Sequence, residues 1–135
     1  MGGMTVYYLA LRNPKLFDSV ILMAPALMHN LPSFVPSITN FIANILPNST
    51  RLLPPMADKS NRNPNVTEYR KKDPYCFNDR AYLSTMNFIV SVMSQSEATF
   101  KEFSCPFMIV QGGLDKLVNP EVAFKLYDEA NVKSS

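Results

Sequence analysis

The sequence predicts an α/β fold in which parallel strands are flanked by helices and interrupted by a helical insertion. Two short apolar runs, residues 19–25 and 105–111, contain β-branched residues and are bounded by polar residues, proline or glycine. Such runs are typical of strands buried on both faces of a parallel sheet. Helical patterns separate them, and strands that alternate with helices favour parallel pairing. With 135 residues, the chain suffices for one domain and not for two.

The first predicted element is a mostly apolar helix over residues 5–12, which Asn13-Pro14 ends because proline cannot continue a helix. A buried helix usually follows a strand and none precedes this one, so we expect the chain to begin inside a structural unit. After the strand over residues 19–25, residues 29–73 are rich in proline, asparagine and serine. They contain an apolar stripe at helical spacing: Ile38, Phe41, Ile42, Ile45 and Leu46.

The last part of the chain carries the clearest pattern. A second helix is predicted over residues 80–93, and the strand over residues 105–111 follows it. Residues 112–115, Gly-Gly-Leu-Asp, form a turn at the carboxyl end of that strand. Asn119 then supplies an N-cap and Pro120 the first helical position, so the final helix is predicted to begin there.

Charge and composition exclude several classes of function. The formal net charge is +2, and the only basic triplet, residues 70–72, is typical of a solvated helix end rather than a nucleic-acid surface. Cys76 and Cys105 form neither a disulfide framework nor a metal site, and no metal or cofactor is predicted. No secretory signal or bilayer-spanning segment occurs, so we expect a cytoplasmic location and leave association with a membrane surface open.

Asp115 is the first candidate for a catalytic group. In open α/β sheets, functional groups gather beyond the carboxyl ends of the strands, and Asp115 closely follows Gln111, the end of a predicted strand. A carboxylate there can orient a histidine and stabilise its imidazolium, as the acid of a catalytic triad does. Gly-Gly-x-Asp is also ordinary turn chemistry, and both interpretations stay open from this segment alone.

Met1-Gly2-Gly3 is the second candidate. In the nucleophile elbow G-x-S-x-G, a serine stands between a strand and a helix, and the next backbone N–H helps to form the oxyanion hole. If a serine preceded Met1, the Met1 N–H would face the oxyanion and Gly2 would be the last glycine of the motif. Without that serine, the three residues are only a flexible chain start.

Both ends of the chain resemble one enzyme family. MGGMTVYYLALRNPKLFDSVILMAPAL, residues 1–27, is similar to the elbow helix and following strand of monoacylglycerol lipases and related lysophospholipases, whose serine stands in Gly-His-Ser-Met-Gly-Gly. CPFMIVQGGLDKLVNPEVAFKLYDEA, residues 105–130, resembles the strand, acid turn and helix that carry their triad aspartate. KDPYCFND, residues 72–79, is similar to the segment that ends the family's cap. The resemblance covers about half of the chain, and the two end motifs together are more specific than either alone.

The resemblance implies a partial α/β-hydrolase fold and a serine hydrolase of fatty-acyl esters. Asp115 would be the triad acid and the Met1 N–H part of the oxyanion hole, while the serine would precede Met1 and the histidine would follow Ser135. We therefore expect the 135-residue chain by itself to be inactive. The implied parts are residues 1–28 (elbow helix and strand), 29–79 (cap insertion) and 80–135 (helix, acid-bearing strand and helix).

The apolar stripe and His29 each have two interpretations. In the family the cap lines the acyl pocket and can touch a membrane, so Ile38, Phe41, Ile42 and Ile45 are either substrate-binding and membrane-facing or ordinary core. His29, the only histidine, is expected in a loop or the cap rather than in the triad.

Two other classes of function stay open. The chain could be a non-enzymatic fragment that binds an apolar ligand or a protein partner. It could also belong to another cap-bearing hydrolase, such as a phenolic-ester esterase, an epoxide hydrolase or a dehalogenase. The residues before Met1 discriminate between these classes: Gly-x-Ser favours the esterase, an aspartate nucleophile favours the epoxide hydrolase or dehalogenase, and a natural start favours the fragment.

Overall fold

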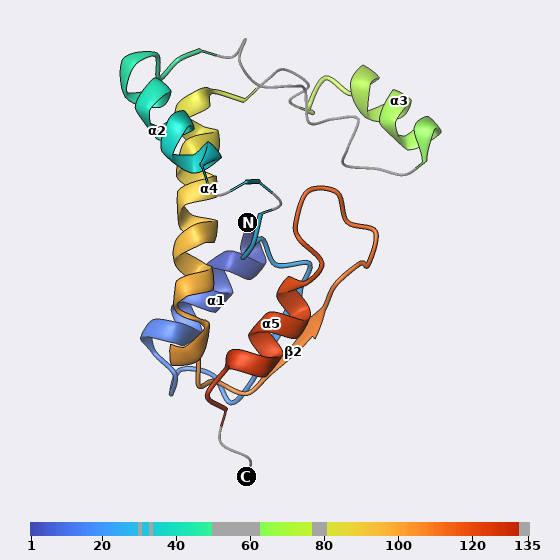
Figure 1. The fold of residues 1–135 in the computed structure, drawn as a ribbon. Helices are drawn as coiled ribbons and strands as arrows, with labels where there is room; N and C mark the ends of the chain where they lie inside the picture. Colours follow the sequence, from blue (N-terminus) through green and yellow to red (C-terminus); the bar gives the residue numbers. More distant parts are fainter. Residues whose placement is uncertain (30, 33, 50–62, 77–80, 133–135) are drawn as a thin grey trace. The chain divides into compact units, whose positions relative to one another are not determined.

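The computed structural model describes residues 1–29, 31–32, 34–49, 63–76 and 81–132 (Figure 1). Its elements are α1 (Gly2–Arg12), β1 (Val20–Met23), α2 (Val35–Ile45), α3 (Pro64–Lys72), α4 (Leu83–Ala98), the 3-10 helix η2 (Phe100–Glu102), β2 (Phe107–Val110) and α5 (Val122–Glu129). They divide into a first unit, Met1–Asn30 with Val92–Ser135, and a second unit, Leu31–Ser91. No helix in the described ranges is long and apolar enough to cross a membrane.

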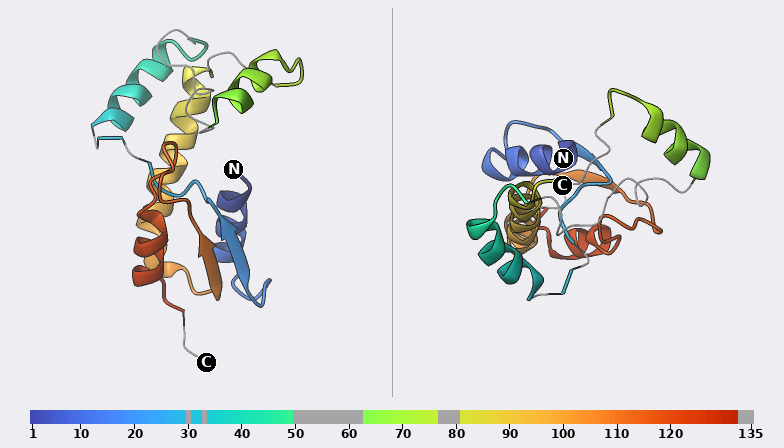
Figure 2. Two further views of the ribbon diagram at one scale, coloured as in Figure 1. Left: turned by 90° about the vertical axis from the view of Figure 1, so that its right-hand side faces the viewer. Right: turned by 90° about the horizontal axis from the view of Figure 1, so that it is seen from above.

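The two strands of the first unit lie side by side and parallel, which confirms the predicted pairing (Figure 2). Val20 pairs with Phe107 and Met23 with Val110. Both strands are shorter than the predicted runs. Pro25 and Pro106 have no N–H for the ladder, so β1 ends before the first proline and β2 begins after the second.

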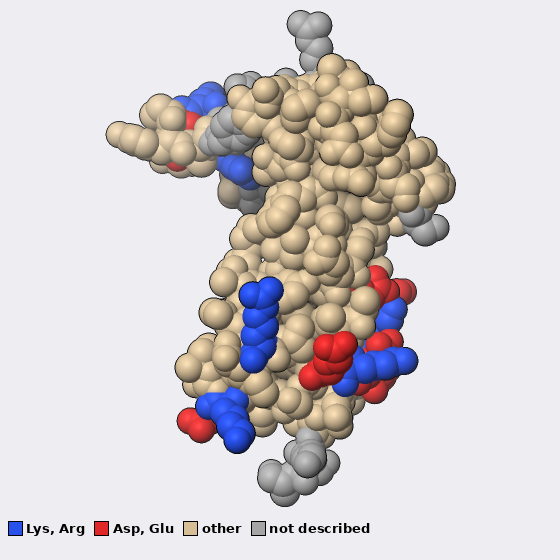
Figure 3. All heavy atoms as spheres, turned by 90° about the vertical axis from the view of Figure 1, so that its left-hand side faces the viewer, with Lys and Arg blue, Asp and Glu red and all other residues tan. Residues whose placement is uncertain are grey.

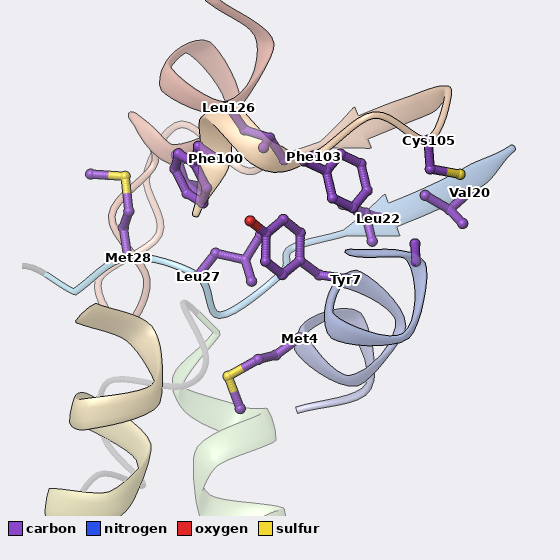
Figure 4. Packing of buried hydrophobic residues seen from close by; sticks show 12 residues of the cluster. Met4, Tyr7, Val20, Leu22, Leu27, Met28, Phe100, Phe103, Cys105 and Leu126 are labelled. Atoms are coloured by element: carbon purple, nitrogen blue, oxygen red, sulfur yellow. The ribbon is translucent and has the colours of Figure 1, made fainter. Parts of the chain in front are cut away.

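The core of the first unit lies between α1, one face of the sheet, η2 and α5. The ring of Tyr7 on α1 stacks on Phe103, with ring centroids 4.8 Å apart, and meets Phe100 edge-on (Figure 4). Full burial of a large apolar side chain stabilises a fold by about 1.5–3 kcal/mol, so these rings hold α1 in place. The other buried members are Met4, Ala10, Val20, Leu22, Leu27, Met28, Cys105, Val122 and Leu126.

A small group of hydroxyls joins α1 to the last turns of α4. The Tyr7 hydroxyl lies 2.9 Å from Thr99 Oγ1 and 3.3 Å from the Ser96 carbonyl. The Tyr8 hydroxyl donates to the Val92 carbonyl (3.1 Å) and accepts from the Ser96 hydroxyl (3.2 Å). Burial raises the pKa of Tyr7 to about 12, because the charged phenolate would lose its hydration.

The opposite face of the sheet is exposed. Ile21, Met23, Met108 and Val110 alternate with the buried strand residues and are 62%, 72%, 53% and 47% exposed. The register sets Ile21 beside Met108 and Met23 beside Val110, so the four side chains form one apolar patch, here called the bare sheet face. The prediction of strands buried on both faces is wrong for the described residues, because their helices cover one face only.

Several helix bounds differ from the predicted ones, and the helix predicted over residues 5–12 begins already at Gly2. The helix predicted to begin at Pro120, with Asn119 as its N-cap, begins at Val122, with Glu121 as N-cap residue. Asn119 forms a turn instead: its side chain accepts from the Glu121 N–H (3.0 Å), and its own N–H donates to the Met28 carbonyl (3.3 Å). The helix predicted over residues 80–93 continues to Ala98 as α4. α3 was not predicted, although Asn63 caps it and Pro64 opens it.

In the second unit, α2 turns its polar side toward α4. The Thr39 hydroxyl donates to Asn87 Oδ1 (3.2 Å), and the Asn87 amide donates to Asn40 Oδ1 (3.1 Å). The predicted stripe therefore faces outward: Ile38, Phe41 and Ile45 are 51%, 68% and 62% exposed. The surface that α2 forms carries no charge (Figure 3), since residues 31–49 contain no Asp, Glu, Lys or Arg.

Candidate functional site

The start of α1 and the ends of β1 and β2 meet at the carboxyl edge of the sheet. A Cβ added to Gly3 would lie 3.0 Å from both Cα and Cβ of Pro25, so only glycine lets α1 approach this closely. A Cβ on Gly2 would meet nothing within 4 Å. Sequence reasoning took Gly2 as the last glycine of the elbow motif. In the described chain it is Gly3, and not Gly2, whose position leaves no room for a Cβ.

The chain leaves β1 through a strained residue. Ala24 has a φ of 44°, a left-handed conformation that costs a non-glycine residue about 1–2 kcal/mol. Its N–H still donates to the Val110 carbonyl (2.8 Å), which extends the pairing to the edge of the sheet. The turn at Ala24 directs Pro25 against Gly3, and it thereby sets the approach of α1 to this edge.

Asp115 lies in the loop that leaves β2 at the same edge, as the sequence predicted. Its Oδ1 accepts hydrogen bonds from the N–H groups of Leu117 (2.8 Å) and Val118 (3.0 Å). Its Oδ2 accepts one bond, from the side-chain amide of Gln111 (3.1 Å). The side chain is partly buried and its own N–H donates to the Gly112 carbonyl (3.1 Å). The carboxylate is thus fixed on one oxygen and can accept a further donor on the other.

Gln111 contacts Asp115 at this edge, and sequence reasoning did not select it as a candidate. It was taken only as the end of a strand, and a glutamine there has no distinguishing pattern. In the structure its Nε2 bonds Asp115, while its Oε1 is buried and has no hydrogen-bond partner among the described residues. Unpaired buried acceptors are rare and call for an explanation.

Met1 lies at the N-terminal end of α1, where the predicted oxyanion-hole residue belongs. Its carbonyl accepts from the Thr5 N–H (3.1 Å), which starts the helix ladder. The N–H groups of a first helical turn have no partner within the helix and carry a partial positive charge. The arrangement can therefore stabilise an oxyanion near the start of α1.

The remaining candidate residues lie on other segments of the chain. Ile38, Phe41, Ile42 and Ile45 lie on α2 in the second unit. His29 follows β1 in a loop, where its Nε2 lies 3.0 Å from the Ser94 hydroxyl.

Two buried or helical groups were considered as nucleophiles: serines of α4 and Cys105. Ser94 and Ser96 lie within α4 rather than in a strand–turn–helix elbow. Both cysteines are free, and burial raises the pKa of the Cys105 thiol, so it stays protonated. No group of three possible metal ligands occurs among the described residues.

Comparisons with known proteins place this geometry in a family. The family model described as serine aminopeptidase, S33, matches residues 1–135. The structure of a monoacylglycerol lipase from Paleococcus ferrophilus superposes with a TM-score of 0.73 at 24% identity, over 97% of this chain and 51% of the lipase. The chain thus shares the α/β-hydrolase fold and spans about half the length of that lipase. No curated protein sequence matches it significantly.

Proposed function

The chain belongs to the serine aminopeptidase S33 family of α/β-hydrolases, and we propose that it is the acid-bearing part of a serine hydrolase of fatty-acyl esters. The observation that carries the proposal is Asp115: a carboxylate held at the carboxyl edge of the sheet, with Oδ2 open to a further donor. The likeness to a monoacylglycerol lipase supports acyl glycerols as substrates.

In the proposed reaction, a serine upstream of Met1 attacks the ester carbonyl while a histidine removes its proton. Asp115 accepts the N–H of that histidine, fixes its tautomer and stabilises the imidazolium. The negative charge that develops on the carbonyl oxygen is stabilised by N–H groups at the start of α1, the Met1 N–H among them. The imidazolium then returns its proton to the leaving alcohol, and water hydrolyses the acyl-enzyme by the same steps.

The apolar stripe of α2 supplies the proposed contact with lipid. An amphipathic helix normally turns its apolar side inward, whereas α2 hydrogen-bonds α4 through Thr39 and Asn40. Ile38, Phe41, Ile42 and Ile45 are then free to line an acyl pocket or to enter a membrane surface. Because α2 is uncharged, we expect the contact to depend on apolar insertion and little on anionic lipid or salt.

The decisive experiment joins the chain to the sequence that flanks it in its gene. The extended protein and the 135-residue chain are treated with a fluorophosphonate that labels activated serines and are assayed on a monoacylglycerol. We expect labelling of a serine just before Met1 and hydrolysis in the extended protein only. Labelling or turnover by the 135-residue chain would contradict the assignment of the nucleophile to the flank.

A second substrate separates ester from peptide chemistry. The family model takes its description from an aminopeptidase, so the same proteins are assayed on an aminoacyl anilide. Cleavage of the anilide without cleavage of the ester would overturn the ester proposal while retaining a serine hydrolase. A flank that supplies no Gly-x-Ser before Met1 would overturn the serine mechanism itself.

A further inference from the structure

The proposed reaction does not explain why a polar side chain, the amide of Gln111, stands in a partly buried position after β2. Its side chain follows β2 and places Oε1 in a buried position without a partner among the described residues. An unpaired buried amide oxygen destabilises the folded protein, a cost that an apolar side chain of similar size would not carry. We therefore look for a function of the Gln111 amide that offsets the cost of its unpaired oxygen.

The other end of the amide indicates that role. Gln111 Nε2 lies 3.1 Å from Asp115 Oδ2. An ionised carboxylate only accepts hydrogen bonds, so the NH2 group must face Asp115 and Oε1 must point away from it. The unpaired oxygen is therefore a consequence of using the amide as a donor to this carboxylate.

The two oxygens of Asp115 are held in different ways. Oδ1 takes two backbone N–H groups, from Leu117 and Val118, which fix its place in the loop. Oδ2 takes Gln111 alone, and this bond holds the rotation of the carboxylate about Cβ–Cγ together with the two bonds to Oδ1. A carboxylate oxygen has two lone pairs, so Oδ2 retains one for a histidine N–H.

We propose that Gln111 is a positioning residue for the triad acid, because its amide aims Oδ2 of Asp115 at the catalytic histidine. The inference rests on the proposed function. It goes beyond it by naming a group that touches neither substrate nor histidine and acts only through Asp115.

The test replaces the amide with a side chain of similar size that cannot donate, Gln111→Met, in the extended protein. Loss of alignment of a catalytic group commonly costs about 10- to 100-fold, and we expect a loss of that size in kcat with KM within about twofold. The acidic limb of the pH profile of kcat/KM should move to lower pH, because a misaligned carboxylate stabilises the imidazolium less. Gln95→Met makes the same exchange at an exposed position on α4 and should leave turnover within about twofold.

The same substitution in a variant without Asp115 separates a positioning role of Gln111 from a purely structural one. In Asp115→Ala, Gln111→Met should cost less than about twofold, because its only route to the reaction is gone. Should Gln111→Met fail to fold, Gln111→Glu keeps the size and sets one carboxylate against another, with the same expected loss of kcat at neutral pH.

The outcomes separate this inference from the function on which it rests. An active extended protein in which Gln111→Met retains normal turnover and an unmoved pH profile overturns the role of Gln111 and leaves the hydrolase proposal standing. Equal losses in both backgrounds overturn it too, in favour of a purely structural role. An extended protein without turnover on any ester removes the proposed function and the role of Gln111 with it.

Discussion

Replacing Asp115 by asparagine tests the proposed triad acid with little disturbance of the fold. The asparagine oxygen can keep the N–H groups of Leu117 and Val118. Its NH2 group would replace Oδ2 and face the Gln111 amide, which can rotate to present its unpaired Oε1 as acceptor. The hydrogen-bond count is thereby preserved, and we expect the free energy of unfolding to change by less than about 1 kcal/mol.

The effect on catalysis should be far larger than the effect on stability. The neutral amide cannot stabilise an imidazolium, and its NH2 donates where the histidine N–H must be accepted, which favours the wrong tautomer. In a serine protease the same exchange lowers turnover by about ten-thousand-fold. We expect a loss of at least about a hundredfold here, or about 2.7 kcal/mol of transition-state stabilisation.

The assay compares turnover on a monoacylglycerol, at equal folded concentration, for the extended protein and its variants. Asp73→Asn and Asp128→Asn serve as controls and should each change turnover by less than about threefold. Asp73 ends α3 and accepts the Tyr75 N–H (2.9 Å), a role that asparagine can also fill, and Asp128 is exposed on α5. If Asp115→Asn behaves like these controls, Asp115 is a turn residue and not the triad acid.

Three further predictions concern stability and lipid binding in the extended protein. Gly3→Ala should lower the free energy of unfolding by about 1–3 kcal/mol, because its Cβ meets backbone, whereas Gly2→Ala should be neutral or slightly stabilising; equal urea midpoints would refute this. Phe41→Glu should weaken binding to uncharged phosphatidylcholine vesicles by at least about tenfold, while the matched exposed aromatic change Tyr69→Glu on α3 should not. Because the folded protein keeps the Tyr7 proton up to a pKa of about 12, stability should fall as the pH rises from about 10 to 12. Tyr7→Phe should make that fall shallower, and an equally steep fall in the variant would count against the assignment.

The sequence predicted best those features that are determined by residues close together in the chain. The two strands, α1 and α2 follow from runs and periodicities, and the parallel pairing of β1 and β2 follows from the helices between them. The turn after β2 placed Asp115 at the sheet edge because strand, glycines and carboxylate are contiguous. These features need no knowledge of tertiary contacts.

The features that sequence reasoning missed depend on contacts that form only in the folded chain. Gly3 differs from Gly2 only because Pro25 packs against it, and Gln111 meets Asp115, four residues later, only because the loop after β2 folds back. The start of α5 shifted because the Asn119 N–H bonds the Met28 carbonyl, far away in the sequence. α3 was missed for another reason: it buries none of its residues and so lacks the apolar stripe that revealed α2, although its capping residues were visible in the sequence.

The pairing of β1 with β2 has a consequence for synthesis of the protein. Val20 pairs with Phe107, so a ribosome making about 5–20 residues per second adds the partner strand on the order of ten seconds later. Throughout that interval the edge of β1 that later pairs with β2 is open, and by its end all residues of the second unit, which is contiguous in the chain, have been made. The second unit is therefore complete in sequence before β1 can pair with β2, and the long segment between the two strands makes their pairing a late step of folding.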